Sequence, residues 1–149
     1  MSTPTLADVV AVLDRAYDPA TAEDWDAVGT TVGDPTAPVA KILLAVDPVR
    51  ATVEEAIGWG ADLLLTHHPL LLRGVTSVAA STPKGRVVHA LLRHGIALHT
   101  CHTNADTPVS ARPCSSDSSH DPKSKVMVST STRRTRSRTA GLRLTSFSV

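Results

Sequence analysis

The chain has 149 residues, of which 42% are hydrophobic and only 3% aromatic, and its formal net charge is +1. This length suffices for one domain with a core of its own. Two cysteines do not make a disulfide framework and suit a reducing compartment, while no apolar run approaches the roughly 20 residues that cross a bilayer. With no secretory leader visible at the N-terminus, we expect a cytoplasmic protein without a membrane partner.

The small net charge conceals two unlike parts of the chain. Residues 1–109 contain 7 Lys/Arg and 12 Asp/Glu, a net charge of −5, whereas residues 110–149 contain 8 Lys/Arg and 2 Asp/Glu, a net charge of +6. The second part is rich in Ser, Thr and Arg and lacks a regular apolar period, apart from a possible short strand at Val126–Val128. The sequence predicts a metal-binding α/β lobe over 1–109. It predicts a tail over 110–149 that is disordered or the remnant of a frameshift or truncation.

Helices and strands are predicted to alternate along the first part. Helical spacing of apolar residues and near-continuous apolar runs give the order helix 6–13, loop 25–35, strand 41–47, helix 48–59, strand 62–66, helix 83–94 and strand 96–101. Short connections between alternating strands and helices are typical of parallel strands with helical crossovers. The expected fold is therefore an α/β lobe with a parallel-rich sheet and helices on both faces.

Polar side chains follow the second and third predicted strands at the point where each strand ends. His67 and His68 come after the second strand, and His102 and Asp106 come after the third. The carboxyl ends of parallel strands line the crevice where ligands bind in open α/β sheets. Imidazole together with carboxylate suits divalent zinc, iron or manganese. Neighbouring histidines on a regular strand would face opposite ways, but Pro69 disturbs that geometry, so both can face the crevice and serve two ions.

A structural interpretation of these residues stays open. A His-His pair after a strand can be exposed without a ligand, and an Asp in this position is often a helix cap or turn former. Trp25 has two interpretations, as an anchor of the first helix on the core or as part of a substrate-facing loop. Cys101 is expected to be a small buried hydrophobe rather than a ligand.

Four stretches of the first part carry motifs of a known family. They are Trp25–Gly29 with Val32–Pro35, Leu43–Asp47, Asp62–Leu70 and His102–Asp106. Together they resemble the Nif-three-like dinuclear-metal-centre hexameric proteins, frequently labelled GTP cyclohydrolase I type 2 homologues. The resemblance covers residues 5–109, the N-terminal part of that family only, and Ala27 replaces the usual Asn of the first motif.

The resemblance implies a toroidal homohexamer of α/β subunits with a two-metal site facing an internal cavity. In this numbering, His67 and His68 would each bind one of the two metal ions. Asp106 would bind beside His68, and His102 lies at the site as a weaker candidate ligand. No catalytic residue is assigned.

The family's remaining ligands belong to a His-x-x-x-Glu pattern near the C-terminus. The only later histidine here is His120, with Ser124 at the Glu position, so we expect an incomplete two-metal hydrolase site for a nucleotide or another phosphorylated or heterocyclic small molecule. The alternatives are a non-enzymatic metal-binding regulatory scaffold and an inactive fragment. Nucleic-acid binding through the arginines of residues 133–138 is a weaker hypothesis, because the run has no interleaved aromatic residue.

Overall fold

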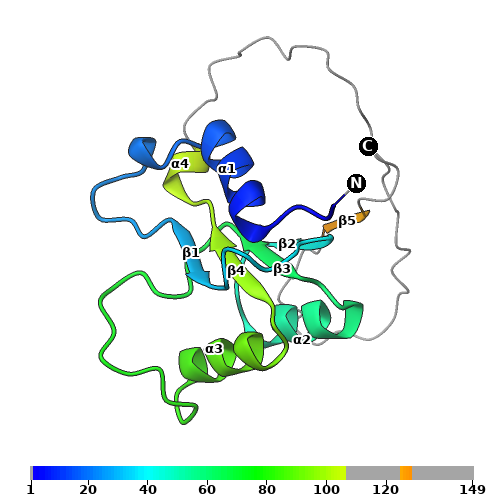
Figure 1. Cartoon of the computed structure of the whole chain (residues 1–149). Helices are drawn as coiled ribbons and strands as arrows, with labels where there is room; N and C mark the ends of the chain where they lie inside the picture. The colour runs from blue at the N-terminus through cyan, green and yellow to red at the C-terminus, as the bar shows by residue number, and fades with distance from the viewer. Residues whose placement is uncertain (1, 107–124, 129–149) are drawn as a thin grey trace, which may run out of the picture.

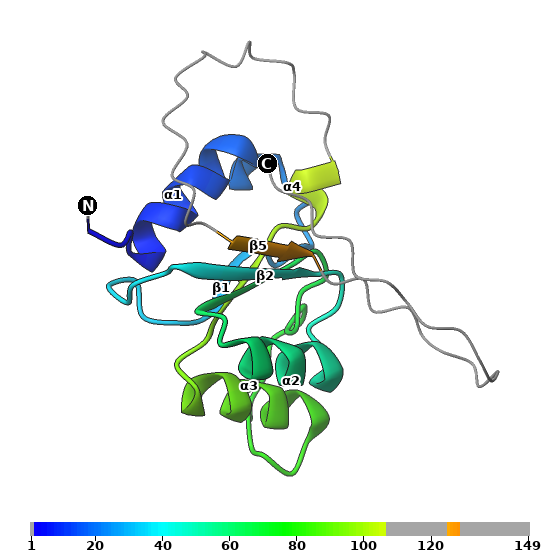
Figure 2. The same ribbon diagram turned by 90° about the vertical axis from the view of Figure 1, so that its right-hand side faces the viewer.

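The computed structural model describes residues 2–106 and 125–128, shown in two views (Figures 1 and 2). The helices are α1 (Leu6–Ala16), the short 3-10 helix η1 (Pro19–Thr21), α2 (Arg50–Trp59), α3 (Pro83–Arg93) and α4 (Thr103–Asp106), and the strands are β1 (Gly29–Val32), β2 (Lys41–Ala45), β3 (Leu63–Thr66), β4 (Ala97–Thr100) and β5 (Lys125–Val128). β5 coincides with the short strand expected at Val126–Val128. The rest of the predicted tail lies outside the described residues.

The strands form one sheet in the order β1-β4-β3-β2-β5. β2, β3, β4 and β5 are parallel, whereas β1 pairs antiparallel with β4. In Figure 2, α1 lies on one face of the sheet and α2 and α3 lie on the other. The predicted α/β fold, parallel-rich with helices on both faces, is confirmed.

Each face of the sheet has its own apolar core. Leu63 packs on the α1 side with Leu6, and Leu64 packs on the opposite side with Leu91 of α3. Leu63 and Leu64 are fully buried. A strand covered on two faces has no polar side to alternate with, which explains its continuous apolar sequence. Among the described residues, no helix has the length and apolar character needed to cross a membrane.

The prediction of a loop over 25–35 was wrong in part, because the segment contains the edge strand β1. Its two central threonines give no apolar alternation, so the strand had no periodic signal. Gly33 follows it with φ +142°, and a Cβ placed there would lie 2.8 Å from the Ala97 Cβ and 2.8 Å from the Leu6 Cδ2. The glycine thus permits the close approach of β1 to the rest of the lobe.

The remaining boundaries differ from prediction by a few residues. α1 continues to Ala16 and is closed at its start by a capping box in which Thr5 and Asp8 exchange hydrogen bonds. α2 begins at Arg50 rather than Pro48, because Val49 has the extended conformation of an N-cap. β3 ends at Thr66 as predicted, whereas β2 and β4 end at Ala45 and Thr100, two residues and one residue earlier than predicted.

Candidate metal centre

The two polar segments meet at the carboxyl ends of β3 and β4, which are neighbours in the sheet. The hydrogen-bond ladder of β3 with β2 continues one step further, since the backbone N–H groups of His67 and His68 donate to Ala45 (3.2 Å) and Val46 (2.8 Å). The Thr66 hydroxyl then donates to the His68 carbonyl (3.0 Å). These bonds hold both histidines at a fixed place beyond the strand end.

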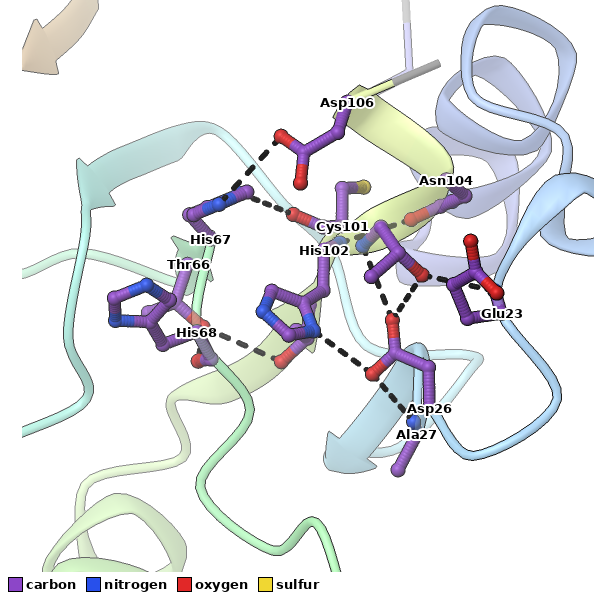
Figure 3. Close-up of polar contacts among 12 residues, drawn as sticks. Glu23, Asp26, Ala27, Thr66, His67, His68, Cys101, His102, Asn104 and Asp106 are labelled. Atoms are coloured by element: carbon purple, nitrogen blue, oxygen red, sulfur yellow. Dashed lines mark hydrogen bonds and ion pairs between the residues drawn. The ribbon is translucent and has the colours of Figure 1, made fainter.

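Three imidazole rings face one another at this place (Figure 3). The ring centroids of His67 and His68 are 5.1 Å apart, those of His67 and His102 are 5.1 Å apart, and those of His68 and His102 are 5.7 Å apart. One nitrogen from each ring lies within 4.8 Å of the others. The adjacent histidines therefore turn to the same side. His102, the weaker candidate from sequence, is a full member of the cluster.

Asp106 lies at the end of α4, close to the cluster. Its Oδ1 is 3.8 Å from the Nε2 of His67. The structure thus places Asp106 beside His67, and the expectation that it shares an ion with His68 stays a prediction. The four candidate ligands from the sequence are together in space.

The Nδ1 atom of each ring has an oxygen partner. His67 Nδ1 lies 3.1 Å from the Cys101 carbonyl oxygen, and His68 Nδ1 lies 2.7 Å from Asp47 Oδ1. His102 Nδ1 lies 2.8 Å from Asp26 Oδ1. A carbonyl or a carboxylate only accepts, so each Nδ1–H donates, and in the neutral form of each ring Nε2 then keeps its lone pair.

Asp26 is the most enclosed charged group of the site. Its side chain is fully buried and accepts from the hydroxyl and backbone N–H of Thr103 as well as from His102. Burial alone would raise the pKa of Asp26, but the hydrogen bonds donated by Thr103, His102 and the backbone of Ala27 outweigh it and lower the pKa to about 2. The residue is therefore a carboxylate at neutral pH.

Asn104 fixes the segment that carries His102 and Asp106. Its buried side chain accepts from the His102 backbone N–H (2.9 Å) and donates to the Tyr17 carbonyl after α1 (2.9 Å). The candidate ligands after β4 are thereby tied to the first helix. Asn104 and Asp26 were not identified from sequence, although both lie inside motifs that the family resemblance quotes.

The donor set fits a divalent metal ion. Three imidazole nitrogens with free lone pairs and one carboxylate are the ligands that zinc, iron and manganese share. Histidine ligands of such ions usually donate the other ring N–H to a carboxylate or a backbone carbonyl. Both kinds of partner occur here. Among the described residues, His67, His68 and His102 form the one group of three or more candidate ligands, so no separate ligand set for a second ion is present there.

Trp25 and Cys101 each contact a ring of the cluster. Of the two interpretations of Trp25, the anchor of α1 on the core requires a buried ring, but Trp25 is 58% exposed and lies edge-on to His102, with centroids 5.9 Å apart. The anchor interpretation is wrong, because the loop turns the indole toward the metal centre. Cys101 is buried with a free thiol, as expected, and burial raises the pKa of that thiol.

A pocket of about 690 Å³ adjoins the cluster between α2 and α3. Asp47 and His68 are among the residues that line it. Apolar side chains such as Val53 and Val87 line its walls, with cationic side chains that include Lys84 and Arg93. A small molecule in this pocket would lie next to His68.

Comparison with known proteins identifies the family. Residues 4–110 match Duf34/NIF3 (NGG1p interacting factor 3). The chain belongs to this family. The Duf34/NIF3 resemblance drawn from the four motifs is thereby confirmed.

Curated relatives carry the name GTP cyclohydrolase 1 type 2 homolog. The Streptomyces coelicolor protein is 62% identical over 104 residues, which cover 70% of this chain and 36% of the relative. The Mycobacterium tuberculosis protein is 54% identical over 112 residues, which cover 75% of this chain and 28% of the relative. The chain thus spans about a third of the length of these Duf34/NIF3 relatives.

Solved Duf34/NIF3 structures share the fold. A Staphylococcus aureus hypothetical protein aligns with a TM-score of 0.68 at 38% identity, covering 70% of this chain and 35% of that chain. A Bacillus cereus protein related to NIF3 aligns with a TM-score of 0.67 at 26% identity, covering 71% and 29% respectively.

Proposed function

We propose that this chain is the metal-binding lobe of a divalent-metal-dependent, hydrolase-like protein. The observation that carries the proposal is the convergence of His67, His68 and His102 within 4.8 Å, with Asp106 beside them. Each ring has an oxygen acceptor on Nδ1, which leaves Nε2 to bind an ion. We include in the proposal the cytoplasmic location expected from the sequence composition and the homohexameric assembly that the family resemblance implies.

The residues of the site would hold zinc, iron or manganese through the three imidazoles and the Asp106 carboxylate. Such an ion supplies Lewis acidity, which polarises a substrate oxygen or a water molecule. The chain itself contributes orientation, because the backbone bonds after β3 and the Asn104 bonds after β4 hold the ligands in place. A second ion would need further ligands from outside the described residues.

The adjoining pocket supports a small-molecule substrate. Its apolar walls suit a planar heterocycle, and Lys84 and Arg93 suit an anionic group such as a phosphate. We therefore propose a nucleotide or another phosphorylated or heterocyclic compound as the substrate class. The curated relatives are named as homologues of a GTP cyclohydrolase, which agrees with that class.

Metal content per chain tests the binding step. We expect at least one transition-metal ion per purified, tag-free wild-type chain and a sharp loss in His68→Ala. His94→Ala removes an exposed histidine at the end of α3 and should retain the wild-type content. A folded wild-type protein without metal after incubation with zinc, manganese or ferrous iron would contradict the proposal.

Turnover separates the enzyme from a regulatory scaffold. The metal-loaded protein is incubated with nucleotides and phosphoesters, and product is measured with and without a chelator. Chelator-sensitive hydrolysis that His68→Ala lacks supports the hydrolase. Stoichiometric metal without turnover across the panel would favour the non-enzymatic scaffold instead.

A further inference from the structure

The carboxylates of Asp26 and Asp47 have no place in the set of candidate ligands, yet each contacts one of the ligand rings. Asp26 Oδ1 lies 2.8 Å from His102 Nδ1, and Asp47 Oδ1 lies 2.7 Å from His68 Nδ1. Both distances are those of charge-assisted hydrogen bonds. In each case the ring nitrogen in contact is Nδ1, which leaves Nε2 without this partner.

A neutral imidazole carries its single proton on either nitrogen, and only the other nitrogen can bind a metal ion. A carboxylate at Nδ1 stabilises the tautomer with Nδ1–H and a free Nε2 lone pair. It also fixes the rotation of the ring about the Cβ–Cγ bond, because the hydrogen bond is directional. His67 obtains the same result from the Cys101 carbonyl, 3.1 Å from its Nδ1.

The two carboxylates differ in how they are held. Asp26 comes from the loop before β1, has no exposed side-chain surface and is itself fixed by Thr103. Asp47 follows β2 and is about half exposed, with a side-chain accessibility of 49%. The same contact is therefore made from two different segments, one rigidly enclosed and one open to solvent.

We propose that Asp26 and Asp47 are positioning residues, which hold His102 and His68 in the single tautomer and orientation that presents Nε2 to the metal ion. This inference rests on the proposed metal-binding function. The two carboxylates contact the rings through Nδ1, so they leave Nε2 available to an ion. They reduce the conformational entropy that the rings would otherwise lose when the ion binds.

The first experiment needs no metal, so it is independent of the proposed function. Histidine ¹⁵N chemical shifts are recorded on the metal-free, full-length chain at a pH of about 8, above the ordinary imidazole pKa of about 6.5. We expect the Nδ1–H tautomer for His102 and His68 in the wild type. In Asp26→Asn the tautomer of His102 should become mixed, and in Asp47→Asn that of His68 should, because the Asn amide offers a donor as well as an acceptor.

The second experiment measures the affinity for Co²⁺ by its visible absorption. Loss of a partner to a ligating histidine typically lowers metal affinity by about 10- to 100-fold, and we expect a loss in this range for each variant. Asp24→Asn is the matched control, because Asp24 is an exposed carboxylate of the same loop as Asp26. It should bind Co²⁺ like the wild type.

Three results would overturn the proposal. One is an unchanged tautomer in both variants, and another is an unchanged Co²⁺ affinity in both. The third is a loss of affinity in Asp26→Asn alone, accompanied by unfolding in circular dichroism, since that indicates a structural role. Asp47→Asn keeps the test decisive in that case, because its half-exposed carboxylate has one hydrogen bond among the described residues. A wild type that shows the expected tautomers but binds no Co²⁺ would refute the proposed function and leave the positioning contacts intact.

Discussion

At the scale of single residues, the surroundings of each histidine decide what it can do. His67, His68 and His102 keep an accessible nitrogen and a fixed orientation, which suits ligand binding. His99 lies three positions before His102, but its ring is 2% exposed inside β4 and its Nδ1 lies 3.0 Å from the Thr30 hydroxyl. It joins β4 to the edge strand β1, and it faces no shared crevice.

The burial of His99 makes the stability of the lobe depend on pH. Burial lowers the pKa of His99 below its usual value, and the charge of Asp14 offsets part of that effect. The unfolded chain then binds the proton at a higher pH than the folded chain. The stabilisation by neutral His99 is fully present above a pH of about 6.5 and is lost as the pH falls through the folded-state pKa.

We predict that the stability difference between wild type and His99→Gln shrinks as the pH falls from about 7.5 to about 5. Urea unfolding followed by circular dichroism at each pH measures the difference. His94→Gln removes an exposed histidine and should give a curve parallel to that of the wild type. If the His99→Gln curve is also parallel to the wild-type curve, the buried ring does not titrate as argued.

At the scale of secondary-structure elements, the effect of replacing a glycine depends on whether a Cβ atom would fit at that position. Gly33 has φ +142° and adjoins the Ala97 and Leu6 side chains. Gly58 lies near the end of α2, and a Cβ placed there would meet no atom within 4 Å. The same substitution at these two positions therefore has opposite consequences.

We predict that Gly33→Ala destabilises the protein by about 2 kcal/mol, because the new methyl group overlaps both neighbours in a backbone conformation that alanine disfavours. Gly58→Ala should stabilise it by about 0.5 kcal/mol, because alanine has the higher helix propensity. Chemical denaturation measures both. A destabilisation of similar size at both positions would contradict the packing argument for Gly33.

Some elements and site residues could be predicted from the sequence, and others could not. Buried strands such as β3 were predictable because they contain a continuous apolar run, here Leu63 to Leu65, and His67 and His68 were predictable because they follow such a strand directly. β1 was not, since an edge strand of threonines between glycines has the sequence of a loop. The hydrogen bond of Asp26 with His102 was also missed. The two residues are 76 positions apart in the sequence, and local sequence patterns do not reveal such a contact.

At the scale of the whole molecule, the candidate metal centre links segments that the chain brings together from far apart. His68 follows β3, His102 follows β4, and Asp26 precedes β1. The hydrogen bonds of His102 and Thr103 with Asp26 join the end of β4 to the loop before β1. An ion bound by these histidines would add a further link between the strand ends, and only the folded chain offers that arrangement.

Metal binding should therefore stabilise the fold by linkage. At a metal concentration about 100 times the dissociation constant, the gain is about 2.7 kcal/mol, which corresponds to a rise in Tm on the order of 10 °C for a lobe of this size. We predict this rise on adding zinc or manganese to the metal-free chain and its reversal by a chelator. His67→Ala should abolish it, whereas His94→Ala should retain it. An equal rise in His67→Ala would mean that the stabilising ion binds elsewhere, because a site that needs three converging imidazoles does not survive the loss of the one that contacts both other rings and Asp106.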